Sequence, residues 1–295
     1  MEYALKTTGI TKKYGRQKVL SGVDINVPKG AVYGLIGKNG AGKTTLLRII
    51  TGLTSSASGE VKMNTPHQKV SAIIEAPGYY DEFTVIDNMK SQCRIRGIDI
   101  DEGKLSEILA MVNLTEAKNK KASKLSLGMK QRLGLAMALV GDTELVILDE
   151  PLNGLDPQGI IDIRNIILNL NKEKGITFII SSHLLGELSK VATVYSFLNN
   201  GVIVKEISQE EVKSSGKVTT SISVSDVKKL AIIFDEMNVE YTVETPTQIT
   251  AYKELSIEEL LPKMQAVDVQ LHELSVNQES IESIYTNIMN DGAGK

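Results

Sequence analysis

The sequence predicts an α/β protein in which a parallel β-sheet carries a phosphate-binding loop, followed by a small α+β domain. Three observations support this fold class. Residues 35–45 read LIGKNGAGKTT and lie between a strand-like apolar run and a helix-like run. Apolar strand-like segments then alternate with helical segments as far as residue 207. Beyond residue 217 the pattern changes to strand, helix, strand, strand, helix and strand.

Length and composition describe an ordinary globular protein with more than one domain. The 295 residues are 42% hydrophobic, which is enough for a buried core. The net charge of -3 gives no electrostatic support for nucleic acid as a partner. Cys93 is the single cysteine, and the first residues lack the basic and apolar parts of a signal peptide, so we expect a cytoplasmic protein. The apolar runs are shorter than the roughly 20 residues of a spanning helix, so we expect no transmembrane segment.

The first predicted element precedes the loop. Residues 19–30, VLSGVDINVPKG, alternate apolar and polar side chains, which predicts a half-buried strand that ends at a Pro-Lys-Gly turn. Tyr14 lies just before this strand. Its ring either stacks on an adenine base or belongs to the core or to a turn, and the sequence favours neither interpretation.

The loop itself fits the pattern G-x-x-x-x-G-K-[ST]. Its glycines allow backbone N–H groups to turn inward around phosphate oxygens, and the helix that begins near Lys43 adds its positive end. Lys43 would reach the β and γ phosphates, and the Thr44 hydroxyl would bind Mg²⁺. A glycine-rich turn before a helix is the alternative. The predicted phosphate-binding residues are Gly37, Lys38, Asn39, Gly40, Ala41, Gly42, Lys43, Thr44 and Thr45.

Short strands are predicted over residues 60–64 and 69–75, the second ending at Glu75, and residues 76–142 then become helical. The lysine-rich run 118–124 is typical of a solvated loop. Ser126 is a good N-cap for the strongly apolar helix that follows, and such a helix N-terminus can bind an anion.

Polar side chains end two further predicted strands. The run ELVILDEP ends in Asp149 and Glu150, and ITFIISSH ends in His183. Because ligand sites of α/β proteins lie at the carboxyl ends of parallel strands, we expect these side chains beside the phosphate loop. A surface acid pair and a structural histidine are the alternatives. Between the two strands, Asp156 lies in a turn before a helix that is predicted to end at Gly175.

Residues 194–206 predict a hairpin with Asn200-Gly201 at its turn, which completes a first domain over residues 1–207. Residues 208–216 form a connecting segment, in which a short helix begins near Ser208. Residues 217–295 form an accessory domain whose element order is that of the split, ferredoxin-like β-α-β arrangement. No chemical constellation is visible there, which favours a scaffold or contact domain.

The segments KKYG, GKNGAGKTT, LSLGMKQR, VILDEP, GLD and SSH resemble, in order and spacing, the ATPase subunits of ATP-binding cassette transporters. The resemblance covers residues 4–206 and implies a P-loop NTPase core with a helical subdomain over residues 76–142. It also implies a head-to-tail homodimer that forms with ATP. Ser126 and Gly128 of one subunit would then contact the γ phosphate held by the other, and Asp156 would link the two sites.

The same resemblance implies the chemistry. ATP would be the substrate and Mg²⁺ the metal, with Asp149 positioning the metal, Glu150 polarising the attacking water and His183 holding the γ phosphate. Integral-membrane permease subunits would be separate chains. The ATPase would then sit peripherally on the inner face of the cell membrane.

Two positions depart from the common pattern. Leu127 and Met129 replace a glycine and a glutamine of the usual LSGGQ, and Glu75 stands where most of the family has glutamine. With SLGMKQRL, this glutamate resembles the ATPases of bacterial exporters that give self-protection against lantibiotics and bacitracin-type peptides. Glu75 would then border the γ phosphate and Mg²⁺ and take part in catalysis. A solvated loop glutamate is the alternative.

Three other functions compete with peptide immunity. The alternative within transport is another drug or lipid exporter of the same broad type. A soluble ATPase of the same family, acting in translation or DNA repair, is disfavoured because the chain has one phosphate loop and no long heptad run. A module that binds nucleotide without hydrolysis is disfavoured because Glu150 and His183 are both present.

Overall fold

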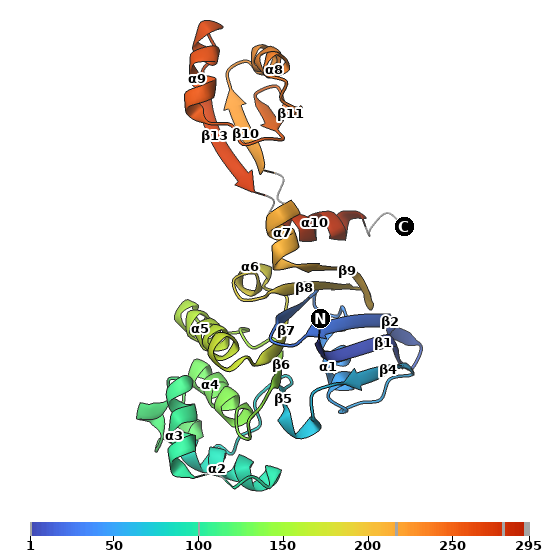
Figure 1. Ribbon diagram of the computed structural model, residues 1–295, viewed down its shortest axis with the longest axis vertical. Coiled ribbons are helices and arrows are strands. Elements are labelled where there is room, and N and C mark those ends of the chain that lie inside the picture. The colour runs from blue at the N-terminus through green and yellow to red at the C-terminus, as the bar shows by residue number, and fades with distance from the viewer. Residues whose placement is uncertain (1, 100, 216–217, 279–280, 292–295) are drawn as a thin grey trace. The chain divides into compact units, whose positions relative to one another are not determined.

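A computed structural model describes residues 2–99, 101–215, 218–278 and 281–291, and the structural statements below concern these residues. Contacts within the chain divide it into two units, Met1–Gln209 and Glu210–Lys295. Each unit has its own sheets and its own buried core, so each is described by itself (Figure 1).

The first unit is built on a six-stranded sheet in the order β5-β6-β7-β3-β8-β9. Five strands are parallel and β9 runs antiparallel to β8. Strands β3, β6 and β7 are buried at every position, as expected of strands with both faces covered. Helices α1 and α5 flank this sheet (Figure 1). The bounds are β3 Val32–Ile36, β5 Val70–Ile73, β6 Leu145–Asp149, β7 Thr177–Ser182, β8 Val194–Asn199, β9 Val202–Ser208, α1 Lys43–Ile50 and α5 Pro157–Lys174.

A second, antiparallel sheet has the order β2-β1-β4. Its strands are β1 Tyr3–Tyr14, β2 Gln17–Pro28 and β4 Ser58–Met63. The alternating pattern of residues 19–30 predicted β2 correctly. The pattern did not predict β1, which pairs with both neighbours through several register shifts. Apolar residues of β1 and β2 share one core with α1 and with the parallel strands.

Between the strands β5 and β6 the chain is helical, with α2 Val85–Arg96, α3 Glu102–Met111 and α4 Leu127–Ala138. Each helix has a side-chain cap: Thr84, Asp101 and Ser126 accept backbone N–H groups of the first turn. The lysine-rich run 118–124 is an ordered segment, because Ala122 N donates to Phe83 O at 2.9 Å and Val85 N donates to Lys120 O at 3.0 Å. The remaining helical elements of this unit are η1 His67–Lys69, η2 Thr115–Ala117, η3 Ala122–Lys124 and α6 Leu185–Leu188.

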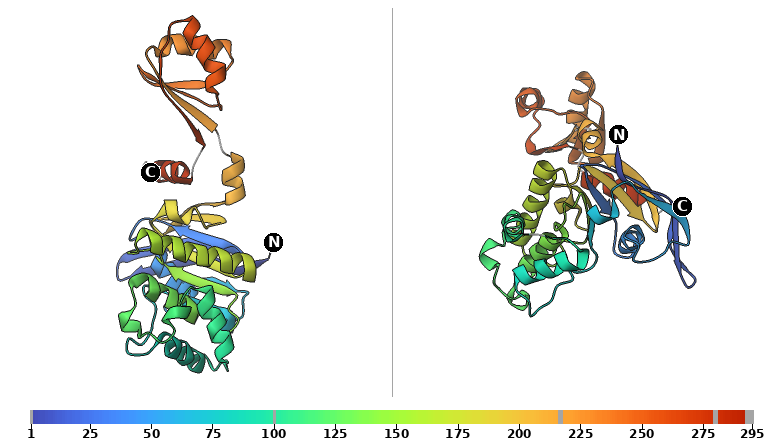
Figure 2. Two further views of the ribbon diagram at one scale, coloured as in Figure 1. Left: turned by 90° about the vertical axis from the view of Figure 1, so that its left-hand side faces the viewer. Right: turned by 60° about the horizontal axis from the view of Figure 1, so that its bottom comes forward.

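The second unit contains a four-stranded antiparallel sheet in the order β11-β12-β10-β13. This order is that of the ferredoxin-like fold, as the alternation of elements predicts. Helices α8 and α9 cover one face of the sheet (Figure 2). Residue 216 of the predicted connecting segment lies outside the described residues. The elements are α7 Gln209–Ser215, β10 Val218–Val224, α8 Val227–Glu236, β11 Tyr241–Thr245, β12 Gln248–Ala251, α9 Ile257–Ala266, β13 Leu271–Gln278 and α10 Ile281–Asp291.

Among the described residues, no helix combines the length and the apolar character that crossing a bilayer requires.

Candidate functional site

The phosphate loop connects β3 to α1 and depends on its glycines. Gly40 and Gly42 have φ angles of 82° and 109°, in the left-handed region that favours glycine. A Cβ on Gly37 would lie 2.4 Å from the carbonyl oxygen of Leu198, so no larger residue fits there. The loop backbone therefore curves tightly, and it has no side chains at these glycines to block the approach of a phosphate group.

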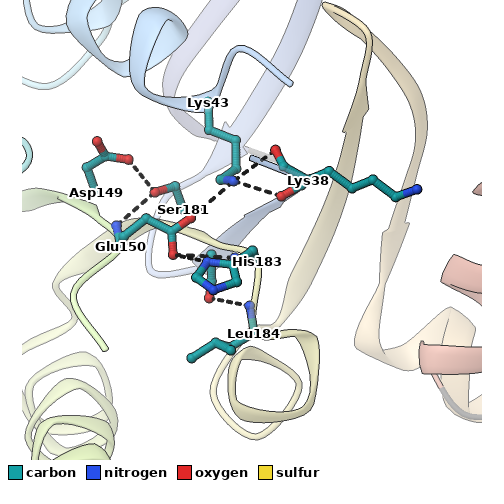
Figure 3. A network of polar contacts seen from close by, with 9 residues as sticks. Lys38, Lys43, Asp149, Glu150, Ser181, His183 and Leu184 are labelled. Atoms are coloured by element: carbon teal, nitrogen blue, oxygen red, sulfur yellow. Dashed lines mark hydrogen bonds and ion pairs between the residues drawn. The ribbon is translucent and has the colours of Figure 1, made fainter. Parts of the chain in front are cut away.

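Lys43 places its ammonium group at the centre of this loop. Its side chain is 6% exposed, and Nζ donates to the carbonyl oxygens of Gly37 at 2.7 Å and Lys38 at 3.3 Å (Figure 3). Nζ also lies 3.1 Å from Oε1 of Glu150. A single buried positive charge thus connects the phosphate loop to the end of β6.

The ends of β6 and β7 form the other side of the site (Figure 3). Ser181 donates its hydroxyl to Asp149 Oδ1 at 2.6 Å, and Oγ of Ser181 accepts the backbone N–H of Glu150 at 2.9 Å. Nδ1 of His183 lies 2.8 Å from Oε2 of Glu150. Glu150 itself has a φ of 49°, an unusual conformation for a residue other than glycine. Its carboxylate is therefore held at both oxygens, by Lys43 and by His183.

The residues present fit a nucleoside triphosphate with a magnesium ion. The loop offers backbone donors and an ammonium group to phosphate oxygens, and the Thr44 hydroxyl and the Asp149 carboxylate are oxygen ligands of the kind Mg²⁺ prefers. Within the described residues no cluster of three or more His, Cys, Asp or Glu side chains could hold a metal alone. Mg²⁺ at nucleotide sites is commonly bound through one or two carboxylates, with phosphate oxygens and water in the rest of its shell.

Ser126 and Gly128 line a second pocket, of about 370 Å³, together with Asp156. The Ser126 hydroxyl accepts from Met129 N at 3.3 Å at the start of α4. The Asp156 carboxylate accepts from Gly159 N at 2.9 Å at the start of α5. Two helix N-termini therefore share this pocket, and its lining includes no residue of the phosphate loop.

Glu75 and Tyr14 lie toward the surface. Strand β5 ends at Ile73, two residues earlier than the pattern suggested, and Glu75 adopts a φ of 67°. Its carboxylate pairs with Arg48 at 2.6 Å and its side chain is 65% exposed. Tyr14, at the end of β1, is 48% exposed, so the interpretation as a core tyrosine is wrong. Tyr14 pairs with Gln17 beside the turn between β1 and β2, in agreement with the interpretation as a turn tyrosine. Nζ of Lys12 lies 5.2 Å from the centre of its ring.

Two contact residues of the site were not predicted. Ser181 joins Asp149 to the backbone of Glu150, and Arg48 pairs with Glu75. The position of Ser181 near a strand end was a usable signal, because it is the first residue of the Ser-Ser-His segment. Arg48 carries no local signal, since its partner lies 27 residues further along the chain.

The sequence profile of the family described as ABC transporter matches residues 20–153. The chain is 34% identical to the bacitracin transport ATP-binding protein BcrA of Enterococcus faecalis over 303 aligned residues. This alignment covers 99% of this chain and 98% of the relative. The chain belongs to the ABC transporter ATPase family. It is an ATPase whose hydrolysis of ATP is coupled to transport.

Another relative and two solved structures agree with this family membership. The lantibiotic transport ATP-binding protein SrtF of Streptococcus pyogenes is 41% identical over 208 residues, 68% of this chain and 90% of the relative. A solved nucleotide-free ATP-binding cassette from an ABC transporter superposes with a TM-score of 0.65 at 29% identity, covering 72% of this chain and 94% of the other. An ATP-binding cassette in its ADP conformation superposes with a TM-score of 0.64 at 30% identity, covering 72% and 93%.

Proposed function

We propose that this ATPase drives a bacterial exporter that gives immunity to an antimicrobial peptide of the bacitracin or lantibiotic type. The alignment to BcrA carries the proposal, because it extends through both units of the chain and not only through the nucleotide-binding core. Glu75 in place of the common glutamine gives independent support.

The side chains at the phosphate loop have distinct roles in this proposal. Lys43 binds the β and γ phosphates, while Glu150 accepts a proton from the attacking water and His183 contacts the γ phosphate. Mg²⁺ bound to ATP would supply positive charge to the phosphate oxygens, and Thr44, Asp149 and Glu75 are its proposed protein ligands. The Lys43–Glu150 and Glu150–His183 contacts support this proposal, because they hold the three side chains next to one another before nucleotide binds.

The pocket at Ser126 and Asp156 is proposed to receive nucleotide from a second copy of the chain. Its helix N-termini present backbone N–H groups, which suit the γ phosphate of an ATP bound to the partner. ATP would therefore close a head-to-tail homodimer. Permease subunits on separate chains would hold this dimer on the inner face of the cell membrane, with residues 217–295 as a contact domain.

A complementation assay in cells tests the proposed role in peptide immunity. A strain that lacks this gene is complemented with the wild-type chain or with Glu150→Gln, and growth is measured against bacitracin, a lantibiotic and an unrelated hydrophobic drug. We expect wild type to restore growth against one of the peptides and Glu150→Gln to fail. Equal peptide susceptibility with and without the wild-type chain would refute peptide immunity, and protection against the unrelated drug alone would assign the chain to another exporter class.

A further inference from the structure

Arg48 on α1 forms an ion pair with Glu75 that the known motifs leave unexplained. Nη2 of Arg48 lies 2.6 Å from Oε1 of Glu75. The two side chains are 37% and 65% exposed, respectively. Glu75 has a left-handed backbone, at a φ that side chains other than glycine rarely adopt. Its conformation is therefore held by its surroundings, and the guanidinium is the partner that holds its carboxylate.

The pair lies next to the nucleotide site. Ile73 of β5 is in register with Leu148 of β6, so the chain at Glu75 leaves the sheet at the same edge as Asp149 and Glu150. Arg48 follows Thr44 by four residues on α1, and residues at this spacing are neighbours on one face of a helix. Arg48 thus connects the Glu75 loop to the helix that carries the phosphate loop.

The charges around the Arg48–Glu75 pair indicate an effect on nucleotide binding. Glu75 adds a third carboxylate at an edge of the sheet that already carries Asp149 and Glu150, beside a site for a polyanion. Lys43 pairs with Glu150, and Arg48 is the cation that pairs with Glu75. An exposed ion pair of this kind contributes little to folding stability, so a structural role is a weak explanation for it. A charge close to bound phosphates, in contrast, acts directly on nucleotide affinity.

We propose that Arg48 is a positioning residue for Glu75: it holds this carboxylate on the face of α1 and balances its charge, so that the nucleotide is not repelled. The inference rests on the proposed place of Glu75 at the site. It requires that Arg48 matters only while residue 75 is an acid. A glutamine at residue 75 needs no counter-charge, and Arg48 then has nothing to position.

The test uses Arg48→Gln, Glu75→Gln and the double variant in the full chain. Lys90→Gln is the matched control, because Lys90 pairs with Glu102 at 2.5 Å with exposures of 37% and 66%, on α2 and away from the loop. We measure equilibrium binding of a fluorescent ATP analogue with and without Mg²⁺, KM and kcat for ATP hydrolysis, and thermal unfolding. These readouts separate nucleotide affinity from turnover and from stability.

We expect Arg48→Gln to raise the Kd and the KM about five-fold, the upper range for an exposed pair, with a smaller change in kcat. The increase should shrink in 1 M salt, where the Debye length falls to about 3 Å. In the Glu75→Gln background, adding Arg48→Gln should change the Kd less than about two-fold relative to Glu75→Gln alone. Lys90→Gln should bind like the wild type.

Three results would overturn the inference: wild-type affinity in Arg48→Gln, an equal loss in the Glu75→Gln background, or a similar loss in Lys90→Gln. These measurements use purified protein and nucleotide, so they do not depend on which compound is exported. A failed peptide-protection assay would refute the proposed function and leave the Arg48–Glu75 result standing.

Discussion

Ser181→Ala should disturb the two catalytic carboxylates through a single oxygen atom. Ser181 is fully buried, and its hydroxyl donates to Asp149 while accepting from Glu150 N. Asp149 is only 5% exposed, so its carboxylate would lose a charge-assisted hydrogen bond in a place that water hardly reaches. Bonds to charged groups contribute about 1.5–3 kcal/mol, and Glu150 N keeps the Ser181 carbonyl at 3.2 Å as a remaining partner. We therefore expect a loss of about 2 kcal/mol in the free energy of unfolding.

Thermal unfolding and steady-state hydrolysis together measure this effect. For a unit of this size, about 2 kcal/mol corresponds to a fall in Tm of about 4–8 °C. Because Glu150 loses an anchor of its backbone, kcat should fall about ten-fold while KM changes little. Thr177→Val is the control: it removes another buried hydroxyl from β7, one that accepts from Gly30 N at 2.9 Å, at the opposite end of the strand. It should lower Tm and spare kcat. A Ser181→Ala protein with wild-type Tm and kcat would refute this reasoning.

The remaining predictions concern the loop lysine, the second unit and Glu206 on β9. Lys43→Ala should weaken binding of a fluorescent ATP analogue at least about ten-fold, because it removes the buried charge presented to the phosphates; unchanged affinity would contradict its role. A chain that ends after Ser215 should keep nucleotide affinity, since the phosphate-facing residues precede it; a folded truncation that does not bind would show otherwise. Glu206 is exposed as a whole residue, but its carboxylate lies against the Tyr33 hydroxyl, and the loss of water there raises its pKa above the ordinary 4.5; the hydrogen bond that Tyr33 donates opposes this shift. The folded state then binds the extra proton, so stability falls as pH rises from 4.5 through the folded pKa. Glu206→Gln should have a higher Tm than wild type at pH 8 and an equal one at pH 4; an unchanged difference between these pH values would contradict the role of burial.

Local signals predicted those parts of the site that consecutive residues build. The glycine pattern, the cap at Ser126 and the Asn200-Gly201 turn each depend on a few neighbouring residues, and the structure has all three where expected. The strand ends at Asp149 and His183 also followed from short apolar runs, and parallel pairing then brings these ends to one edge.

Contacts between residues far apart in the chain could not be predicted from local sequence patterns. Strand β1 has no clean alternation, because its register shifts repeatedly against β2. The Arg48–Glu75 pair and the Ser181 bridge join residues about 30 apart in the chain. The register of β6 against β7 brings Ser181 to Asp149, whereas the Arg48–Glu75 pair joins helix α1 to the loop after β5. The positive φ of Glu150 is likewise imposed by its partners, since glutamate has no intrinsic preference for that region. What could be predicted was therefore the phosphate loop and the polar residues at the strand ends, and what could not was how these residues hold one another.

Glu150→Gln tests the central claim most directly, because the amide keeps the size of the carboxylate but is a far weaker base toward water. Purified wild type and Glu150→Gln are compared for phosphate release with Mg·ATP and for elution volume on size exclusion with and without Mg·ATP. We expect the variant to bind ATP, to release phosphate at least about a hundred-fold more slowly and to elute as a dimer when ATP is present. Phosphate release at the wild-type rate would contradict the assignment of Glu150 as the base and, with it, the account of how this site hydrolyses ATP.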